Sequence, residues 1–391
     1  MDDSGRIAPA VETVSWPAAI AAMACISIAG IGLGLGAPLL SVLLEQRGYS
    51  ATMIGINTAI GGVGSVLCAP LATPLAMRLG AANTMIGAAL LGGASFIGFY
   101  FTQDYAVWLG LRFALHFALT LLFILSEFWI ASSAPPSRRG FVLGIYATVL
   151  SLGFAAGPML FAVLGSAGFA PFGAGIALML LALIPIVLAR ALSPDLTRSD
   201  DSHPGFWRYV WLVPTATAAV FVFGAVETAG FSLLPVHGAA IGYSESEAAL
   251  LLSMVGLGNV VMQVPLGYWS DRIGDRRRLL ALCAAIGLAG MLVMPLIQQN
   301  WWAVAAMLFI WGGVVAGLYT IGLAHLGASL AGAELAAANS AFVACYSFGM
   351  LLGPFAIGAG MDGLGDAGFS STIAAFFAAY LVLVLWRIAR K

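Results

Sequence analysis

Long apolar runs alternate along the chain with short breaks rich in charged, proline or glycine residues. A hydrocarbon core roughly 30 Å thick needs about 20 apolar residues per helical span, and the runs reach that length. They lack the alternation of a barrel strand, and backbone groups in lipid must be paired internally, so each run predicts a transmembrane α-helix. The predicted spans are 16–44, 51–76, 81–101, 105–133, 138–165, 171–192, 209–237, 245–270, 277–297, 301–330, 334–360 and 366–387. The predicted fold class is an all-α membrane protein with 12 transmembrane helices.

A single long hydrophilic stretch interrupts the pattern, at 193–208 near the middle of the chain. It is too polar to span a bilayer, so it predicts a cytoplasmic linker. The chain then divides into an N-terminal six-helix bundle, 1–192, and a C-terminal six-helix bundle, 209–391.

Basic residues concentrate on one side of this topology, and the opposite side holds only Arg47. An excess of Lys and Arg marks cytoplasmic loops, so both termini are expected in the cytoplasm and the chain in a bacterial inner membrane. The residues on the side of the termini are Arg6, Arg78, Arg138, Arg139, Arg190, Arg198, Arg208, Arg272, Arg276, Arg277, Arg278, Arg387, Arg390 and Lys391.

The composition agrees with this interpretation: 61% of the residues are apolar, 8% are charged, and the mean hydropathy is +1.00. This apolar composition makes a lipid bilayer the expected partner. The net charge is −1 and there is no basic patch, so nucleic acid is not an expected partner. Cys25, Cys68, Cys283 and Cys345 fall in apolar spans without metal-ligand spacing and are expected to be small core residues. No metal, no cofactor and a monomeric state are expected. The first apolar run is too long for a cleaved signal peptide, so it is expected to be retained.

The two halves carry related motifs. Gly153-x-x-x-Gly157-Pro158 recurs as Gly349-x-x-x-Gly353-Pro354, and Arg78-Leu-Gly80 recurs as Arg272-Ile-Gly274. Both repeats are offset by about 195 residues, half the chain, and such internal repeats are typical of transporters.

The segment Gly267-Tyr-Trp-Ser-Asp271-Arg272-Ile-Gly274-Asp-Arg276-Arg277 resembles the loop signature of the major facilitator superfamily. The resemblance covers the whole chain and implies two pseudo-symmetric six-helix bundles. It also implies a cytoplasmic gate in which glycines let helices approach closely and Asp271 accepts hydrogen bonds from a helix end. The first-half counterpart, which ends at Arg78, departs from the pattern because Met77 stands where the acid is expected.

Span five carries Gly144, Gly153, Gly157 and Pro158, a spacing that resembles the superfamily's antiporter motif without its trailing glycines. Helix packing is the alternative, because small residues spaced by four let helices approach whatever the protein transports. The segments around 111–140 and 318–354 resemble the YcaD-like branch of bacterial transporters.

Ionisable side chains inside a membrane helix are costly and usually face a cavity or a partner. Arg112 matches the superfamily's fourth-helix arginine, and His116 follows one turn later where that motif usually has glycine. Thr120 and Glu127 lie within roughly 80° of Arg112, so one face of this helix is predicted to be a polar cavity wall.

Glu227 lies deep in the otherwise apolar span seven. A carboxyl desolvated there can exchange protons near neutral pH, which favours a proton or substrate role over a structural hydrogen bond. Glu227, Arg112 and His116 are therefore the candidates for proton coupling. Glu127 lies near the cytoplasm, where a gate salt bridge to Arg138 or Arg139 is expected.

Other polar residues are candidates for the substrate cavity. Each of them could equally join helices by a hydrogen bond, and an aromatic residue could simply pack. The candidates are Asn259, Gln263, Trp311, Tyr319, His325, Asn339 and Tyr346.

The favoured function is secondary active transport of a small solute by alternating access. A proton is the expected coupling ion, because intramembrane Glu and His residues are present and no Walker phosphate loop is. Efflux by antiport is slightly favoured, with a proton-coupled uptake symporter or a non-transporting receptor or scaffold as alternatives. An enzyme is not expected, since neither HExxH nor GxSxG occurs.

Overall fold

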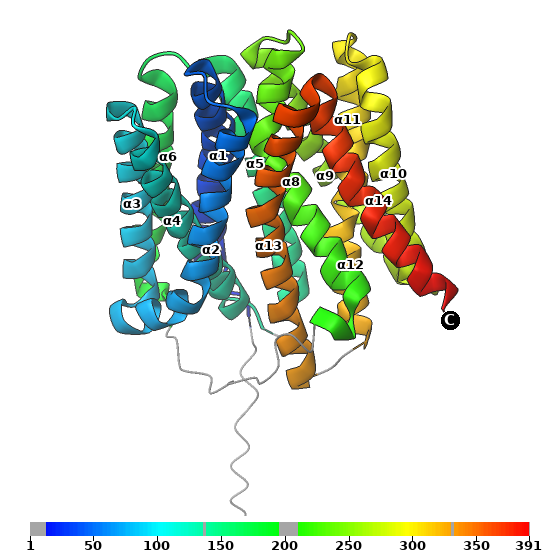
Figure 1. The fold of residues 1–391 in the computed structure, drawn as a ribbon. Coiled ribbons are helices and arrows are strands. Elements are labelled where there is room, and N and C mark those ends of the chain that lie inside the picture. Colours follow the sequence, from blue (N-terminus) through cyan, green and yellow to red (C-terminus); the bar gives the residue numbers. More distant parts are fainter. Residues whose placement is uncertain (1–12, 136–137, 195–209, 330–331, 391) are drawn as a thin grey trace, which may run out of the picture.

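The computed structural model describes residues 13–135, 138–194, 210–329 and 332–390, and this part of the chain is helical with short connections. Figure 1 shows the helices. Their bounds are α1 Trp16–Gln46, α2 Ala51–Leu79, α3 Ala81–Phe101, α4 Tyr105–Ser132, α5 Arg139–Leu164, α6 Ala170–Leu188, η1 Arg190–Leu192, α8 Pro214–Ala240, α9 Glu245–Arg272, α10 Arg276–Ile297, α11 Trp301–Val315, α12 Gly317–Ser329, α13 Gly332–Leu364, η2 Gly365–Ala367 and α14 Gly368–Ala389.

The predicted all-α fold is confirmed. Eleven segments of the described residues are long and apolar enough to cross a membrane, and the last of them, Ala338–Ala389, is 52 residues long and contains most of α13 and all of α14. One predicted span, 301–330, forms two helices, α11 and α12, which meet at Ala316. Gly312, Gly313 and Gly317 surround this break, and glycine weakens a helix by about 1 kcal/mol relative to alanine. The predicted linker lies almost entirely outside the described residues.

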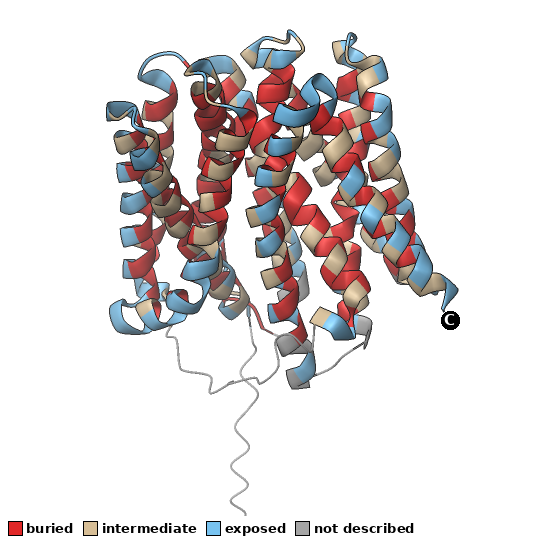
Figure 2. Ribbon diagram, viewed as in Figure 1, coloured by how far each residue is buried: buried red, intermediate tan, exposed pale blue. Residues whose placement is uncertain are grey.

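The helices form two groups, α1–α6 and α8–α14, which Figure 1 shows side by side. They are called the first half and the second half below. The connections at 47–50, 165–169, 241–244 and 365–367 share one end of the molecule, here named the outer end, and the opposite end is the inner end. Figure 2 shows that buried residues face the interior of the bundle and exposed residues face outward.

The repeated glycines pack the same way in both halves. A Cβ added to Gly153 would lie 2.8 Å from the carbonyl oxygen of Ser27 on α1, and one added to Gly349 would collide with the carbonyl oxygen of Phe221 on α8. Ser27 and Phe221 are themselves offset by about 195 residues. The glycine repeat is thus a matched close contact of α5 with α1 and of α13 with α8.

The following turn repeats the arrangement. A Cβ at Gly157 would meet the carbonyl oxygen of Ile31 on α1 at 2.7 Å, and one at Gly353 would collide with that of Ala225 on α8. Gly144 has open space around its Cα. Helix packing therefore accounts for two glycines of the span-five motif, and Pro158 continues the same helix α5.

Candidate functional site

Asp362 joins the two halves at the outer end. Its carboxylate, in the last turn of α13, accepts hydrogen bonds from the backbone N–H groups of Ala51 (3.0 Å) and Thr52 (2.9 Å). Both groups belong to the first turn of α2, where unpaired donors and the helix dipole favour an anion. A second-half side chain thus caps a first-half helix.

Glu245, the first residue of α9, makes a second junction. It accepts hydrogen bonds from the backbone N–H (2.9 Å) and hydroxyl (2.8 Å) of Ser166 and from the side-chain amide of Gln46 (2.6 Å). Ala51 and Glu245 are equivalent in the internal repeat, as are Ser166 and Asp362, at an offset of about 195 residues. Among the described residues, hydrogen bonds between the halves are recorded at the outer end alone.

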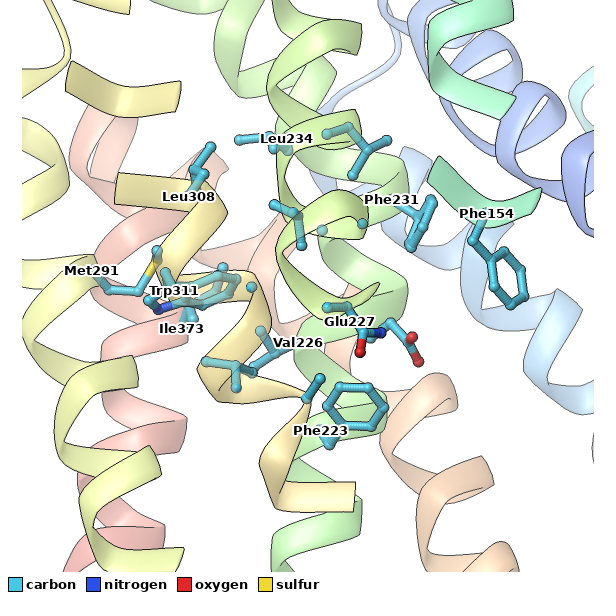
Figure 3. A pocket seen from close by; sticks show the side chains of 18 of the residues that line it. Phe154, Phe223, Val226, Glu227, Phe231, Leu234, Met291, Leu308, Trp311 and Ile373 are labelled. Carbon is cyan, nitrogen blue, oxygen red and sulfur yellow. The ribbon is translucent and has the colours of Figure 1, made fainter. Parts of the chain in front are cut away.

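A cavity of about 60 Å³ lies in the second half, lined by residues of α8, α9, α10, α11 and α14, and α5 of the first half covers one side of it. Figure 3 shows Phe154 on one side of it and Glu227, Phe231 and Trp311 around it. Sites for drug-sized ligands occupy roughly 300 Å³ or more, so this cavity is too small to hold such a ligand.

Glu227 supplies the carboxylate of this cavity. Its Oε2 accepts a hydrogen bond of 2.7 Å from the hydroxyl of Tyr346 on α13. The Tyr346 ring contacts the rings of Tyr319 and Phe223, with centroids 6.1 and 6.2 Å apart. The structure therefore brings together Glu227, Tyr346 and Tyr319, three residues that the sequence suggested separately.

Trp311 and Asn259 also line the cavity, but their polar atoms are placed differently. The Trp311 indole N–H donates a hydrogen bond of 3.0 Å to the carbonyl oxygen of Gly287 on α10, so this donor is already paired within the protein. Asn259 Oδ1 is buried and has no hydrogen-bond partner in the described part of the chain. Gln263, one turn nearer the inner end, is half-buried and is absent from the cavity lining.

The polar stripe of α4 changes in exposure along its length. Glu127 is exposed and Thr120 is half-buried, whereas His116 and Arg112 are only 6% and 1% exposed. Thr120 donates to the hydroxyl of Ser65 at 2.8 Å, and His116 Nδ1 lies 3.2 Å from the carbonyl oxygen of Arg112. The stripe is thus accessible near the inner end and sealed toward the outer end.

Glu127 accepts a hydrogen bond of 3.0 Å from the hydroxyl of Tyr146 on α5. Arg138, an expected salt-bridge partner, is exposed and precedes α5, and the side chain of Arg139 lies outside the described part of the structure. The Glu127 to Tyr146 contact was missed because it depends on the register of two helices, which no local motif encodes.

Arg112 and Glu227 are not in contact. No ion pair between them is recorded in the described part of the chain, and Arg112 is absent from the cavity lining. Arg112 packs within the first half, on the helix turn before His116, whose ring abuts Gly61 of α2. The expected coupling between them therefore requires a change of conformation.

The gate loop begins at the inner end of α9. Arg272 is exposed, with its guanidinium carbon 3.9 Å from the ring centroid of Tyr268, and Arg78 is exposed at the end of α2. The side chain of Asp271 lies outside the described residues. Gly267 and Gly274 have open space around them, so the close helix approach expected there is absent in this conformation.

An ion pair next to the gate loop was missed by the sequence reasoning. Arg277 contacts the Asp275 carboxylate at 2.9 Å and donates to the carbonyl oxygen of Arg387 at 2.9 Å, which ties α10 to α14. The acidic residue between Gly274 and Arg276 was the available signal. The remaining candidates are near the inner end, where His325 is half-buried in α12 and Asn339 is exposed in α13.

Comparison with known proteins gives one family. The family model described as Major Facilitator Superfamily matches residues 22–244 and 215–391. The MFS-type transporter YfkF of Bacillus subtilis is 29% identical over 343 residues, covering 85% of this chain and 86% of YfkF. The MFS-type transporter YcaD of Escherichia coli is 22% identical over 278 residues, covering 71% and 72%. Among solved structures, a D-xylose–proton symporter has the same fold, with a TM-score of 0.75 at 15% identity over 95% of this chain and 97% of that one.

Proposed function

We propose a function from the premise that this chain belongs to the Major Facilitator Superfamily, whose members are membrane transporters and not enzymes. The protein moves a small solute across a bacterial inner membrane by alternating access, and protons are the coupling ion. It acts as a monomer, with both termini in the cytoplasm and the inner end facing that compartment.

The observation that carries this proposal is the difference between the two ends of the molecule. At the outer end, Asp362 and Glu245 join the halves through helix termini. Toward the inner end, the α4 stripe becomes exposed at Glu127. A protein sealed at one end, with a polar wall accessible from the other, has the geometry of one state of an alternating-access cycle.

Glu227 is the proposed proton carrier. It is a carboxylate in an otherwise largely apolar cavity, and its one recorded hydrogen bond comes from Tyr346. Protonation changes the charge of this cavity, so the two forms of Glu227 favour different arrangements of the halves. Arg112 and His116 act with Glu227 in the coupling when the halves move.

The gate loop of α9 is proposed to close the inner end when the outer end opens. Gly267 and Gly274 have the free space that a close helix approach would fill. Asp271 would then accept hydrogen bonds from a neighbouring helix end, as the family signature implies.

Antiport is favoured over symport because span five resembles the superfamily's antiporter motif, although two of its glycines also serve helix packing. Proteoliposomes test the proposal when internal pH is recorded while solutes of a broad panel are added outside. Antiport predicts that an added solute drives protons outward, and symport predicts inward flow. Solute movement without proton movement would contradict coupling, and no movement of any solute would contradict transport.

A further inference from the structure

A buried cluster of hydrogen-bond donors in the first half lies apart from the Glu227 cavity. Arg112 on α4 and Asn57 on α2 are each 1% exposed. Arg112 Nε and Asn57 Nδ2 are buried, and neither has a hydrogen-bond partner in the described residues. Arginine stays charged under all ordinary conditions, so this position carries a permanent positive charge in the membrane interior.

The packing of α2 against α4 places the two side chains at one level. The hydroxyl of Tyr105 donates to the carbonyl oxygen of Met53, and the hydroxyl of Thr120 donates to that of Ser65. Between these contacts, Gly61 abuts the ring of His116. The contacts of Gly61 with His116 and of Ser65 with Thr120 share an offset of 55 residues, and the same offset one turn nearer the outer end pairs Asn57 with Arg112.

No carboxylate of the described part of the chain forms an ion pair with Arg112. Glu127, on the same helix, is about 22 Å away at 1.5 Å per residue. Its carboxylate already accepts a hydrogen bond from the hydroxyl of Tyr146. Asp104 caps the start of α4 through Val107, and Glu227 accepts from Tyr346 in the other half. An isolated buried charge is strongly unfavourable, so Arg112 favours the binding of a negative group.

The α4 stripe provides the route for such a group. Its exposure falls from Glu127 through Thr120 to His116, and Arg112 lies at the sealed end. A solute that enters along this wall from the inner end therefore meets the guanidinium at the end of its path.

We propose that the transported solute carries an oxyanion, a carboxylate or a phosphate, and that Arg112 and Asn57 bind it. The fork of guanidinium donors matches the two oxygens of such a group, and the Asn57 amide adds a neutral donor. This inference rests on the proposed transport function and names the substrate class. Glu227 remains free to carry the proton.

The first test measures binding by thermal unfolding of the purified full chain in detergent. The probes are benzoate, succinate and inorganic phosphate, with benzamide and succinamide as neutral counterparts. At least one anion should raise the melting temperature saturably while its amide does not, and Arg112→Gln should abolish the effect. An equal shift in Arg112→Gln, or stabilisation by the amides alone, would overturn the proposal, and no response to any anion would count against it.

The second test needs no ligand. Arg112→Met removes an uncompensated buried charge, so it should raise the melting temperature of the empty protein. Arg277→Met is the matched control and should lower it, because the Arg277 guanidinium pairs with the Asp275 carboxylate at 2.9 Å and donates to the carbonyl oxygen of Arg387. A fall in melting temperature for Arg112→Met would show that the arginine has a structural partner and would overturn the proposal. Both readouts are independent of transport, so failure of the proteoliposome assay would remove the proposed function without deciding this one.

Discussion

Ser166 and Asp362 occupy equivalent places in the two halves, and each bonds to the start of a helix in the opposite half. Asp362 supplies the acceptor for the backbone of α2, whereas Ser166 supplies donors to Glu245 at the start of α9. In one junction the carboxylate belongs to the residue that reaches the helix start, Asp362. In the other it belongs to the helix start itself, Glu245, so each junction contains one carboxylate. The outer end is thus closed by two pseudo-symmetric contacts that hold no basic side chain.

The hydrogen bonds of Asp362 and Glu245 are expected to hold the outer end closed. Asp362→Asn and Glu245→Gln weaken charge-assisted hydrogen bonds between the halves, so each should increase the population of an outward-open state. Spin labels on Gln103→Cys and Gln299→Cys, exposed residues in outer-end connections of the two halves, report the separation. Asp366→Asn, an exposed acid outside the junctions, is the control and should leave the distances unchanged. Unchanged distances in both junction variants would show that these hydrogen bonds do not hold the outer end closed.

The glycine repeat makes a prediction about stability. Gly153→Ala and Gly349→Ala place a methyl group against a carbonyl oxygen of the neighbouring helix, and overpacking costs about 1–3 kcal/mol. Both variants should lower the melting temperature. Gly144→Ala, on α5 with open space around it, should be neutral or slightly stabilising because alanine favours a helix. Equal changes in melting temperature at all three positions would show that helix propensity, and not the contact with the neighbouring helix, determines the effect of these substitutions.

Topology is predicted by the arginine bias and is open to direct test. A reporter fused after Arg390 should be active only as a cytoplasmic marker, and one inserted near Gly242 should report the periplasm. The opposite pattern would reverse the assignment of the inner and outer ends and with it the direction of the cycle.

The sequence predicted the helices well because burial in lipid imposes long apolar runs. It also identified the glycine repeat, since a close helix contact requires small residues at a fixed spacing. Glu227 was identified because a carboxylate is conspicuous in an apolar span.

Contacts between distant helices could not be predicted in this way. The bond from Tyr146 to Glu127 and the capping of α2 by Asp362 depend on helix register, and so does the proposed pairing of Asn57 with Arg112. Asn57 is an ordinary polar residue in its own segment and becomes notable only beside a buried charge. The two halves of the molecule bring these residues together through packing, for which no local pattern exists.

Protonation of Glu227 is proposed to switch the protein between its two states. The most direct measurement is the distance between spin labels on Gln103→Cys and Gln299→Cys as pH is varied from about 5.5 to 8.5, a range that brackets neutral pH, where a desolvated carboxyl can titrate. The otherwise unaltered protein should redistribute between a short and a long distance, because the charged and neutral forms of Glu227 favour different arrangements. Glu227→Gln, fixed in a neutral form, should hold one distribution at every pH. A pH-dependent redistribution in Glu227→Gln equal to that of the unaltered protein would contradict the account.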